Sequence, residues 1–195
     1  MINRFSNLLC DFLIELDMIS YEDKHIFVYA FFLIISSVFF FSLTIFFGLI
    51  FNCIINCIVF YISFRAIRHF AGGYHADTEM RCEILTTLSF LAATYFISLS
   101  EKTVVQIIAL VGAFLSTIVI AAFAPLDTPA KPLDEDEKRK YRRISLIILS
   151  IIVSVIIVSI LFKIQLLLVP CSLSLLLEAI LLTAGKIKGH LVTTG

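Results

Sequence analysis

The sequence contains no tryptophan, and charged residues occupy only 15% of its 195 positions. Hydrophobic residues occupy 60%, above the about 45–50% of a typical soluble domain, and they fall into long runs. Lipid is therefore the expected environment of most of the chain. Without tryptophan, aromatic anchoring at a membrane surface falls to tyrosine. The formal net charge is zero, which excludes a bulk electrostatic attraction to nucleic acid.

The five cysteines form neither a Cys-x-x-Cys pair nor a cluster of metal ligands. Four of them lie in apolar surroundings, where cysteine behaves as a small hydrophobic residue. A disulfide framework is not expected in helices embedded in lipid. Acidic residues interrupt the apolar ones throughout 1–25, so we expect no cleavable signal peptide.

The long apolar runs predict an all-α, polytopic membrane helical bundle with about six transmembrane spans, forming a single domain over 1–195. Residues 26–64 are almost uncharged, and their length is about twice the roughly 20 residues that one span needs. We therefore expect two spans there, joined by a tight turn near 48–52. The other four spans are expected at about 83–99, 103–123, 144–162 and 165–184.

Apolar residues recur every three or four positions through 1–20, between acidic ones. This spacing predicts an amphipathic helix within 1–24. Because no apolar run there is long enough to cross a bilayer, we expect an interfacial helix lying on the membrane surface. A helix packed on the bundle is the alternative.

Lysine and arginine are distributed unevenly among the connecting segments. If the termini, 65–81 and 125–143 share one side of the membrane, that side carries thirteen basic residues and the other side two. This bias predicts that both termini are cytoplasmic. A single span over 26–64 would instead place the N-terminus outside, moving only Arg4 and Lys24.

Titratable residues also gather in 65–82, which we interpret as a catalytic loop followed by the start of a helix. This segment contains His75 and, seven residues later, Cys82, which are a candidate base and nucleophile. On one continuous helix they would lie about 10.5 Å apart along the axis, whereas a hydrogen bond between them needs about 3–3.5 Å. The paired Gly72 and Gly73 predict that the backbone leaves the helical conformation here.

A new helix is expected to begin just beyond this turn, capped by Asp77 or Thr78. Cys82 would then lie about one turn inside the helix, and the loop would carry His75 back toward it. The positive helix end and the neighbouring Arg81 favour a thiolate at Cys82. His75 would take the thiol proton and return it to a leaving amine, and free amides at the helix start would hold an oxyanion.

The spacing leaves alternatives open. Asp77 and Glu79 are both candidates to orient the histidine, and nothing in the sequence chooses between them. Cys82 could simply pack in an apolar helix, His75 could be solvated, and His69 competes as the base, although its place at the end of a span favours an interfacial role. A metal site built from these acids, His75 and Cys82 lacks the spacing of a closed ligand set, so we expect no metal or cofactor.

A second charged region, 124–143, is interpreted as a cytoplasmic basic loop. Its basic run could attract an acidic peptide or anionic lipid, at about 1 kcal/mol for each charge near the surface. The alternative is an ordinary positive-inside anchor. The acidic residues 134–137 precede the run and are expected to cap the helix that leads into the next span. The basic run consists of Lys138, Arg139, Lys140, Arg142 and Arg143.

At these residues the chain resembles the accessory gene regulator B (AgrB) family, membrane peptidases of bacterial quorum sensing. The first match consists of Arg68, Gly73, His75, Ala76 and Cys82. The second is the run Ala-Pro-Leu-Asp-Thr-Pro-Ala-Lys-Pro-Leu at 124–133, followed by basic residues as far as Arg143. Length, hydropathy and the amphipathic start agree as well, so the resemblance covers nearly the whole chain.

The resemblance implies a cysteine endopeptidase of the bacterial cell membrane. Its substrate would be a pheromone precursor with an amphipathic N-terminal helix and an acidic C-terminal tail. Cys82 would attack the peptide bond before the tail, with His75 as its base, and would hold the remaining peptide as a thioester. A cysteine or serine of the precursor would then close a thiolactone or lactone ring.

The resemblance also marks Arg68 and Gly73 as essential. We interpret Gly73 as the turn, and Arg68 as a charge partner for the acidic tail or for Asp77. The need to enclose a peptide suggests a homodimer. Two rival functions are plain hydrolysis without cyclisation, and a non-enzymatic transporter or assembly factor in which 68–82 is a structural re-entrant loop. A transporter predicts polar residues at several span centres, where this sequence offers mainly serine, threonine, Asn52 and Asn56.

Overall fold

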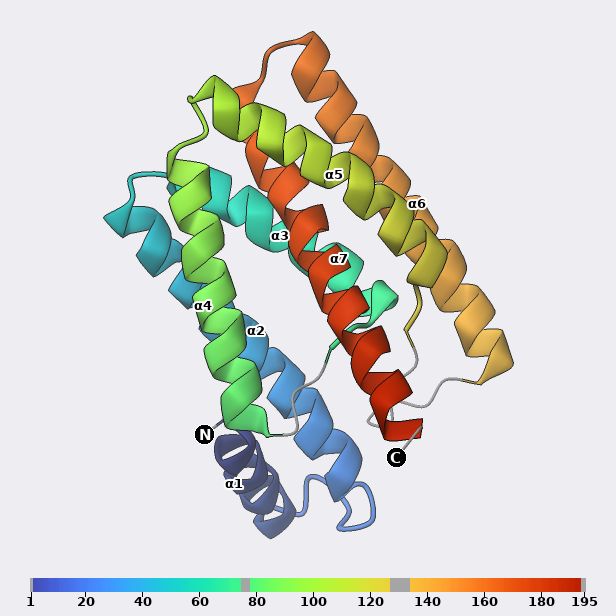
Figure 1. Cartoon of the computed structure of the whole chain (residues 1–195). Coiled ribbons are helices and arrows are strands. Elements are labelled where there is room, and N and C mark those ends of the chain that lie inside the picture. Colours follow the sequence, from blue (N-terminus) through green and yellow to red (C-terminus); the bar gives the residue numbers. More distant parts are fainter. Residues whose placement is uncertain (1, 75–77, 127–133, 194–195) are drawn as a thin grey trace. The chain divides into compact units, whose positions relative to one another are not determined.

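The computed structural model describes residues 2–74, 78–126 and 134–193 (Figure 1). These residues form helices and short turns, with no strand among them. The helices are α1 (Ile2–Glu15), α2 (Lys24–Ile50), α3 (Ile54–Ala71), α4 (Glu79–Ser98), α5 (Thr103–Phe123), α6 (Glu135–Leu161) and α7 (Gln165–Thr193). The expected all-α class is therefore confirmed.

Six of these helices, α2 to α7, are long and apolar enough to cross a membrane. This confirms the six predicted spans, including the two expected within 26–64. The turn between α2 and α3 lies where the sequence predicts it, with Asn52 at φ 53° and the Cys53 amide donating to the Gly48 carbonyl at 2.9 Å. A Cβ on Gly48 would lie 2.9 Å from the Ile54 Cα, so only glycine permits so close a turn.

Two connecting segments are shorter than the sequence suggests. Helix α3 continues to Ala71, so Arg68 lies on its last turn rather than in a loop beginning at residue 65. Helix α6 already begins at Glu135, so the basic run to Arg143 is helical and not a loop. Asp134 caps α6, and a capping box with Glu137 confirms that the acidic residues start this helix.

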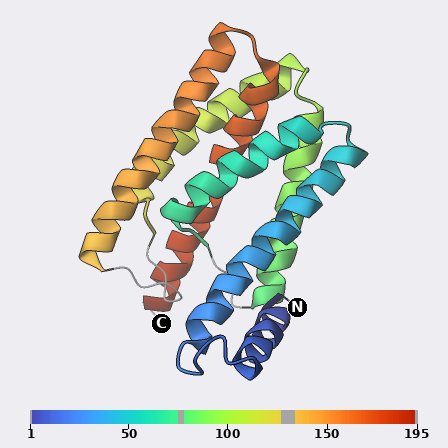
Figure 2. The same cartoon turned by 180° about the vertical axis from the view of Figure 1, so that it is seen from behind.

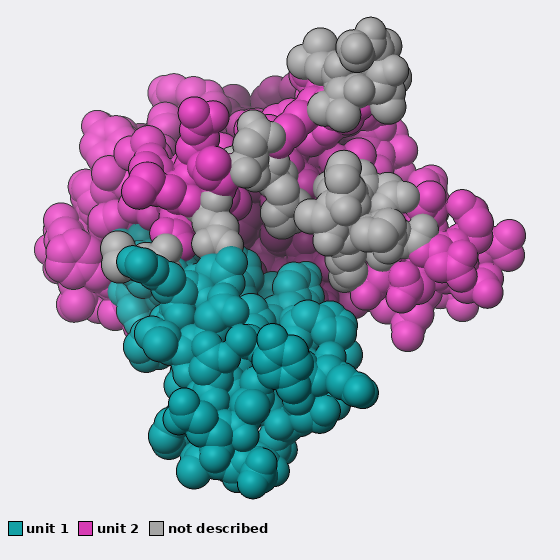
Figure 3. All heavy atoms as spheres, turned by 90° about the horizontal axis from the view of Figure 1, so that it is seen from below, with its two compact units in different colours: residues 1–43 teal, residues 44–195 magenta. Residues whose placement is uncertain are grey.

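The chain forms two compact units, residues 1–43 and 44–195, which Figure 3 shows in different colours. In the first unit, α1 ends at Glu15 and exposes an apolar stripe of Phe5, Leu8 and Phe12. That stripe suits a helix that lies on lipid. Its position at the membrane surface stays a prediction.

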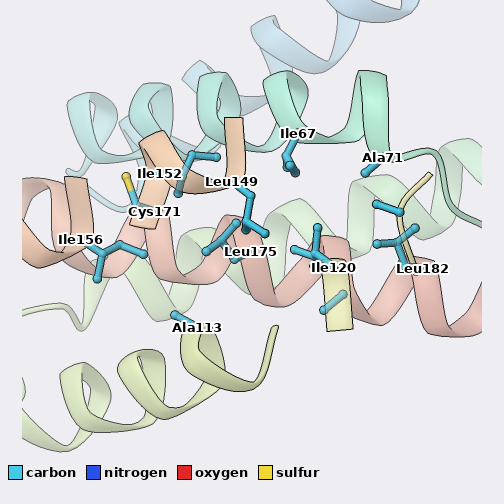
Figure 4. Packing of buried hydrophobic residues seen from close by; sticks show 12 residues of the cluster. Ile67, Ala71, Ala113, Ile120, Leu149, Ile152, Ile156, Cys171, Leu175 and Leu182 are labelled. Carbon is cyan, nitrogen blue, oxygen red and sulfur yellow. The ribbon is translucent and has the colours of Figure 1, made fainter. Parts of the chain in front are cut away.

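In the second unit, α7 runs through the middle and packs against α3, α5 and α6 (Figures 1 and 2). Every third or fourth side chain of α7 enters the shared core, as at Cys171, Leu175 and Leu182 (Figure 4). Ile67 of α3 and Ile120 of α5 meet this stripe. Lipid is as apolar as these side chains, so close packing rather than exclusion of water holds the helices together.

Candidate active site

Cys82 lies one turn inside α4, as the sequence predicts. Thr78 is the N-cap, and its hydroxyl accepts a hydrogen bond from the Arg81 amide at 3.4 Å. The Cys82 amide donates to the Thr78 carbonyl at 3.1 Å, which closes the first turn of the helix. The Cys82 thiol is free and its side chain half-buried.

His75 and Asp77 lie outside the described residues, and so does the side chain of Glu79. The contact between imidazole and sulfur therefore stays a prediction, and both candidates for the orienting acid stay open. What the structure describes is how the chain is held on either side of these residues. Gly72, Gly73 and Tyr74 lead into His75, and Thr78 begins α4.

The Arg68 guanidinium holds the segment that leads into His75. Its Nη1 donates to the Gly72 carbonyl and its Nη2 donates to the Tyr74 carbonyl, each at 2.7 Å. The planar fork of arginine suits two such bonds at once. Arg68 thus closes the end of α3 and fixes the direction in which the chain leaves it.

Both glycines in this segment have backbone angles that other residues rarely adopt. Gly72 has φ 74° and Gly73 has φ 132°. A Cβ on Gly73 would lie within van der Waals overlap of the Arg68 Nη1, and a Cβ on Gly72 would lie 2.7 Å from the Leu126 carbonyl oxygen. Glycine is therefore needed twice, for the turn and for the space that Arg68 occupies.

Two segments that are far apart in the sequence join at this turn. The Leu126 amide donates to the Ala71 carbonyl at 2.9 Å, and residues 72 and 126 form an isolated parallel bridge. The Arg142 guanidinium, from the basic run on α6, donates to the Ala124 carbonyl at 3.4 Å. The start of the second sequence motif therefore packs against the first, while residues 127–133 of that motif lie outside the described part of the chain.

Helix α7 also contacts this turn. The Tyr74 amide donates to the Leu181 carbonyl at 2.9 Å. A Cβ on Gly185 would lie 2.9 Å from the Tyr74 amide nitrogen, so glycine allows α7 to pass close to the loop. One turn before Leu181 on α7, Glu178 is fully buried, and its Oε1 lies 3.8 Å from the Arg68 Nη1.

Glu178 is not among the residues predicted from the sequence. The available signal was a lone acidic residue in the otherwise uncharged stretch from Gln165 to Gly185. An ionisable residue inside a span is costly and usually has a function or a partner. Here the partner is Arg68.

The basic run lies on the first turns of α6. Arg139, Lys140, Arg142 and Arg143 are exposed, and Lys138 pairs with Glu135 at 3.5 Å. These side chains leave the helix in several directions, so the run presents positive charge broadly rather than as one site. Within the described residues, no group of three or more His, Cys, Asp and Glu could hold a metal ion.

Comparison with known proteins identifies the family of this chain. The family model described as accessory gene regulator B matches residues 4–182. The chain belongs to this family. The matched range includes both sequence motifs, Glu178 and all six candidate spans up to the last turns of α7. No solved structure matches the chain.

Relatives in the accessory gene regulator B family are distant. An AgrB-like protein of Clostridium perfringens is 26% identical over 136 residues, which cover 67% of this chain and 64% of that protein. An AgrB-like protein of Lactiplantibacillus plantarum is 27% identical over 112 residues, 57% of this chain and 56% of its own. The accessory gene regulator protein B of Staphylococcus saprophyticus is 29% identical over 98 residues, 48% and 50% of the two chains. The matches thus span half to two thirds of these relatives.

The close fit of Gly73 predicts that Gly73→Ala destabilises this family member. A side chain at φ 132° costs about 1–3 kcal/mol in backbone strain, and the new methyl group would also displace the Arg68 guanidinium. We expect a lower midpoint of thermal unfolding in detergent. Gly189→Ala is the matched control, because nothing lies within 4 Å of a Cβ there. Equal midpoints for the two variants would contradict the described turn.

Proposed function

We propose that the chain is a membrane-embedded cysteine endopeptidase that removes the C-terminal tail of a quorum-sensing pheromone precursor and cyclises the remaining peptide. The observation that carries the proposal is the anchored turn. Leu126 binds Ala71 at the end of α3, Arg68 and Leu181 bind the residues that lead into His75, and Cys82 follows within the first turns of α4. A short loop that is anchored before the histidine and leads into a capped helix is what a histidine and a cysteine seven residues apart require in order to meet.

The reaction would proceed in two acyl transfers. His75 takes the proton of the Cys82 thiol, and the thiolate attacks the carbonyl carbon of the peptide bond before the tail. The tetrahedral intermediate collapses, the C–N bond breaks, and His75 returns the proton to the leaving amine. The upstream peptide is left as a thioester on Cys82. Amides at the start of α4 or in the turn would bind the oxyanion.

The second transfer would conserve the energy of the acyl bond. A thiol or hydroxyl of the precursor loses its proton to the base and attacks the thioester carbon, and the Cys82 thiolate leaves. The product is a thiolactone or lactone ring. Water would give a linear acid instead, so the site should exclude water once the tail has left. A position at the end of two membrane spans suits that requirement.

The proposal extends to the partners and the setting of the enzyme. The exposed positive charge at the start of α6 would attract the acidic tail and anionic lipid. In Figure 1, α4 and α6 begin and α7 ends at the same end of the second unit. We infer that this end faces the cytoplasm of a bacterial cell, with both termini on that side. A homodimer would help to enclose the peptide.

The alternative function is a transporter, and a charged residue within a membrane span would support it. Glu178 is such a residue. Its pairing with Arg68, which in turn binds the Gly72 and Tyr74 carbonyls, links it to the loop beside His75 and favours the peptidase.

The proposal is tested by expressing the chain in membranes with a tagged precursor that carries an amphipathic helix, a cysteine or serine and an acidic tail. We expect mass spectrometry to find the free tail, and a peptide lighter by one water than the linear fragment. A linear fragment alone would support hydrolysis without cyclisation. An intact precursor, with the precursor shown to reach the membrane, would argue against a peptidase of this specificity.

A further inference from the structure

We propose that Glu178 is a positioning residue: its carboxylate holds the Arg68 guanidinium in place, and Arg68 in turn holds the loop that carries His75. The expected effect of Glu178 on catalysis rests on the proposed peptidase function. The expected ordering of residues 72–74 by Glu178 does not depend on that function.

The carboxylate of Glu178 is buried inside the protein. Glu178 is 0% exposed and lies on the face of α7 that enters the core, between Leu175 and Leu182. Neither of its carboxylate oxygens accepts a hydrogen bond from any residue that the structure describes. An acidic side chain in such surroundings is expensive, so a chain that needed only packing at this position would use leucine, as the neighbouring turns do.

The partner of this carboxylate is Arg68. The Arg68 Nη1 lies 3.8 Å from the Glu178 Oε1, and the Arg68 side chain is only 16% exposed. Attraction between opposite charges is strong where little water screens it. At 3.8 Å the contact is an ion pair rather than a hydrogen bond, so Glu178 fixes the place of the guanidinium and leaves its N–H groups to other acceptors.

The N–H groups of the Arg68 guanidinium bind two backbone carbonyls. Nη1 reaches the Gly72 carbonyl and Nη2 reaches the Tyr74 carbonyl, each at 2.7 Å. The Tyr74 carbonyl belongs to the peptide bond that joins Tyr74 to His75. A shift of the guanidinium would therefore move the backbone directly before the proposed base.

Helix α7 also contacts this loop at two further points. The Leu181 carbonyl accepts from the Tyr74 amide at 2.9 Å, and Gly185 lies against Gly73 and Tyr74. Glu178, Leu181 and Gly185 are three and four residues apart, so they share one face of the helix. One face of helix α7 thus positions the loop at several points. Glu178 is the charged residue of that face, and it acts on the loop through Arg68.

The test compares wild type, Glu178→Gln and Ser174→Ala as full-length proteins in lipid nanodiscs. Glutamine keeps the size of the side chain and removes its charge. Ser174 is equally buried one turn away, but its hydroxyl donates to the Cys171 carbonyl within α7, so it is a matched control for the loss of a buried polar group. Two readouts are needed, amide hydrogen exchange in peptides covering 71–80 and the kinetics of precursor cleavage.

For Glu178→Gln we expect faster exchange at 71–80 and a fall in kcat of about 100-fold, the scale of a misplaced catalytic group. KM should change little, because Glu178 is fully buried and is not part of the exposed basic run. Ser174→Ala should match wild type in both readouts. Unchanged exchange and unchanged kcat in Glu178→Gln would overturn the inference, as would an equal change in Ser174→Ala.

Glu178→Asp keeps the proposal testable if the glutamine variant does not fold. Aspartate restores the charge on a shorter side chain, so it should recover folding and most of the protection at 71–80. If aspartate behaves no better than glutamine, charge is not what Glu178 supplies, and the inference fails. If the wild type itself cleaves no precursor, the proposed function fails, while the exchange data still decide whether Glu178 orders the loop.

Discussion

Cys82→Ala is expected to abolish release of the tail from the precursor, with a loss of about 10⁴-fold or more, as when other covalent enzymes lose their nucleophile. Alanine cannot form the thioester, and Cys82 is the only cysteine in α4. His75→Ala should cost about 10²–10⁴-fold, the usual contribution of a general base. Both are measured by mass spectrometry of the tagged precursor.

Cys53→Ala is the matched control for these variants. Cys53 is the N-cap residue of α3, at the end of this helix away from Arg68, and its sulfur lies 3.6 Å from that of Cys57. Its loss should leave cleavage unchanged. If cleavage survives Cys82→Ala, the peptidase assignment at this site is wrong, and 68–82 is a structural loop.

Arg68→Ala is expected to have the second largest effect, because it removes three interactions at once. It deletes both hydrogen bonds to the carbonyls of 72 and 74, and it leaves Glu178 buried without its countercharge. Removing one partner of a buried ion pair typically costs about 3–5 kcal/mol. We expect both a lower midpoint of thermal unfolding in detergent and the loss of cleavage.

A double variant separates these two consequences of losing Arg68. In Arg68→Ala with Glu178→Leu no charge is left uncompensated, so much of the lost thermal stability should return. Cleavage should stay lost, because nothing holds the Gly72 and Tyr74 carbonyls. Recovery of cleavage together with stability would mean that Arg68 acts only through stability. Arg65→Ala, one turn earlier on α3, controls for the loss of a positive charge and should have the smaller effect.

Local features of the site were predictable from the sequence. Thr78 was one of two expected caps for α4, and the acidic residues before the basic run were expected to start a helix. Caps depend on a side chain and backbone amides two or three residues away, so neighbouring residues carry the information. The position of Cys82 one turn inside α4 follows from the cap.

The ends of helices α3 and α6 were predicted less well. Arginine and lysine at 65–71 and 138–143 suggested loops, because charged residues normally mark the limit of a span. In the structure both stretches are helical. A helix can extend past the apolar layer when its charged side chains remain in water, as on α6, or when they find a buried partner, as Arg68 does on α3. Hydropathy therefore locates the span and not the end of the helix.

The sequence by itself determined the six spans, the turn between α2 and α3, and the family motifs, because a bilayer requires long apolar helices and a turn requires particular residues. Only the tertiary structure decided what Arg68 does. Its partners are two carbonyls of the following turn and a carboxylate on α7, far along the chain. Contacts between helices depend on how the faces of distant segments pack together. The spacing of residues in a single sequence does not show which two helices will pack against each other. Glu178 is isolated from other charges in the sequence. The packing of α7 against α3 places it beside Arg68, which binds the proposed active-site loop.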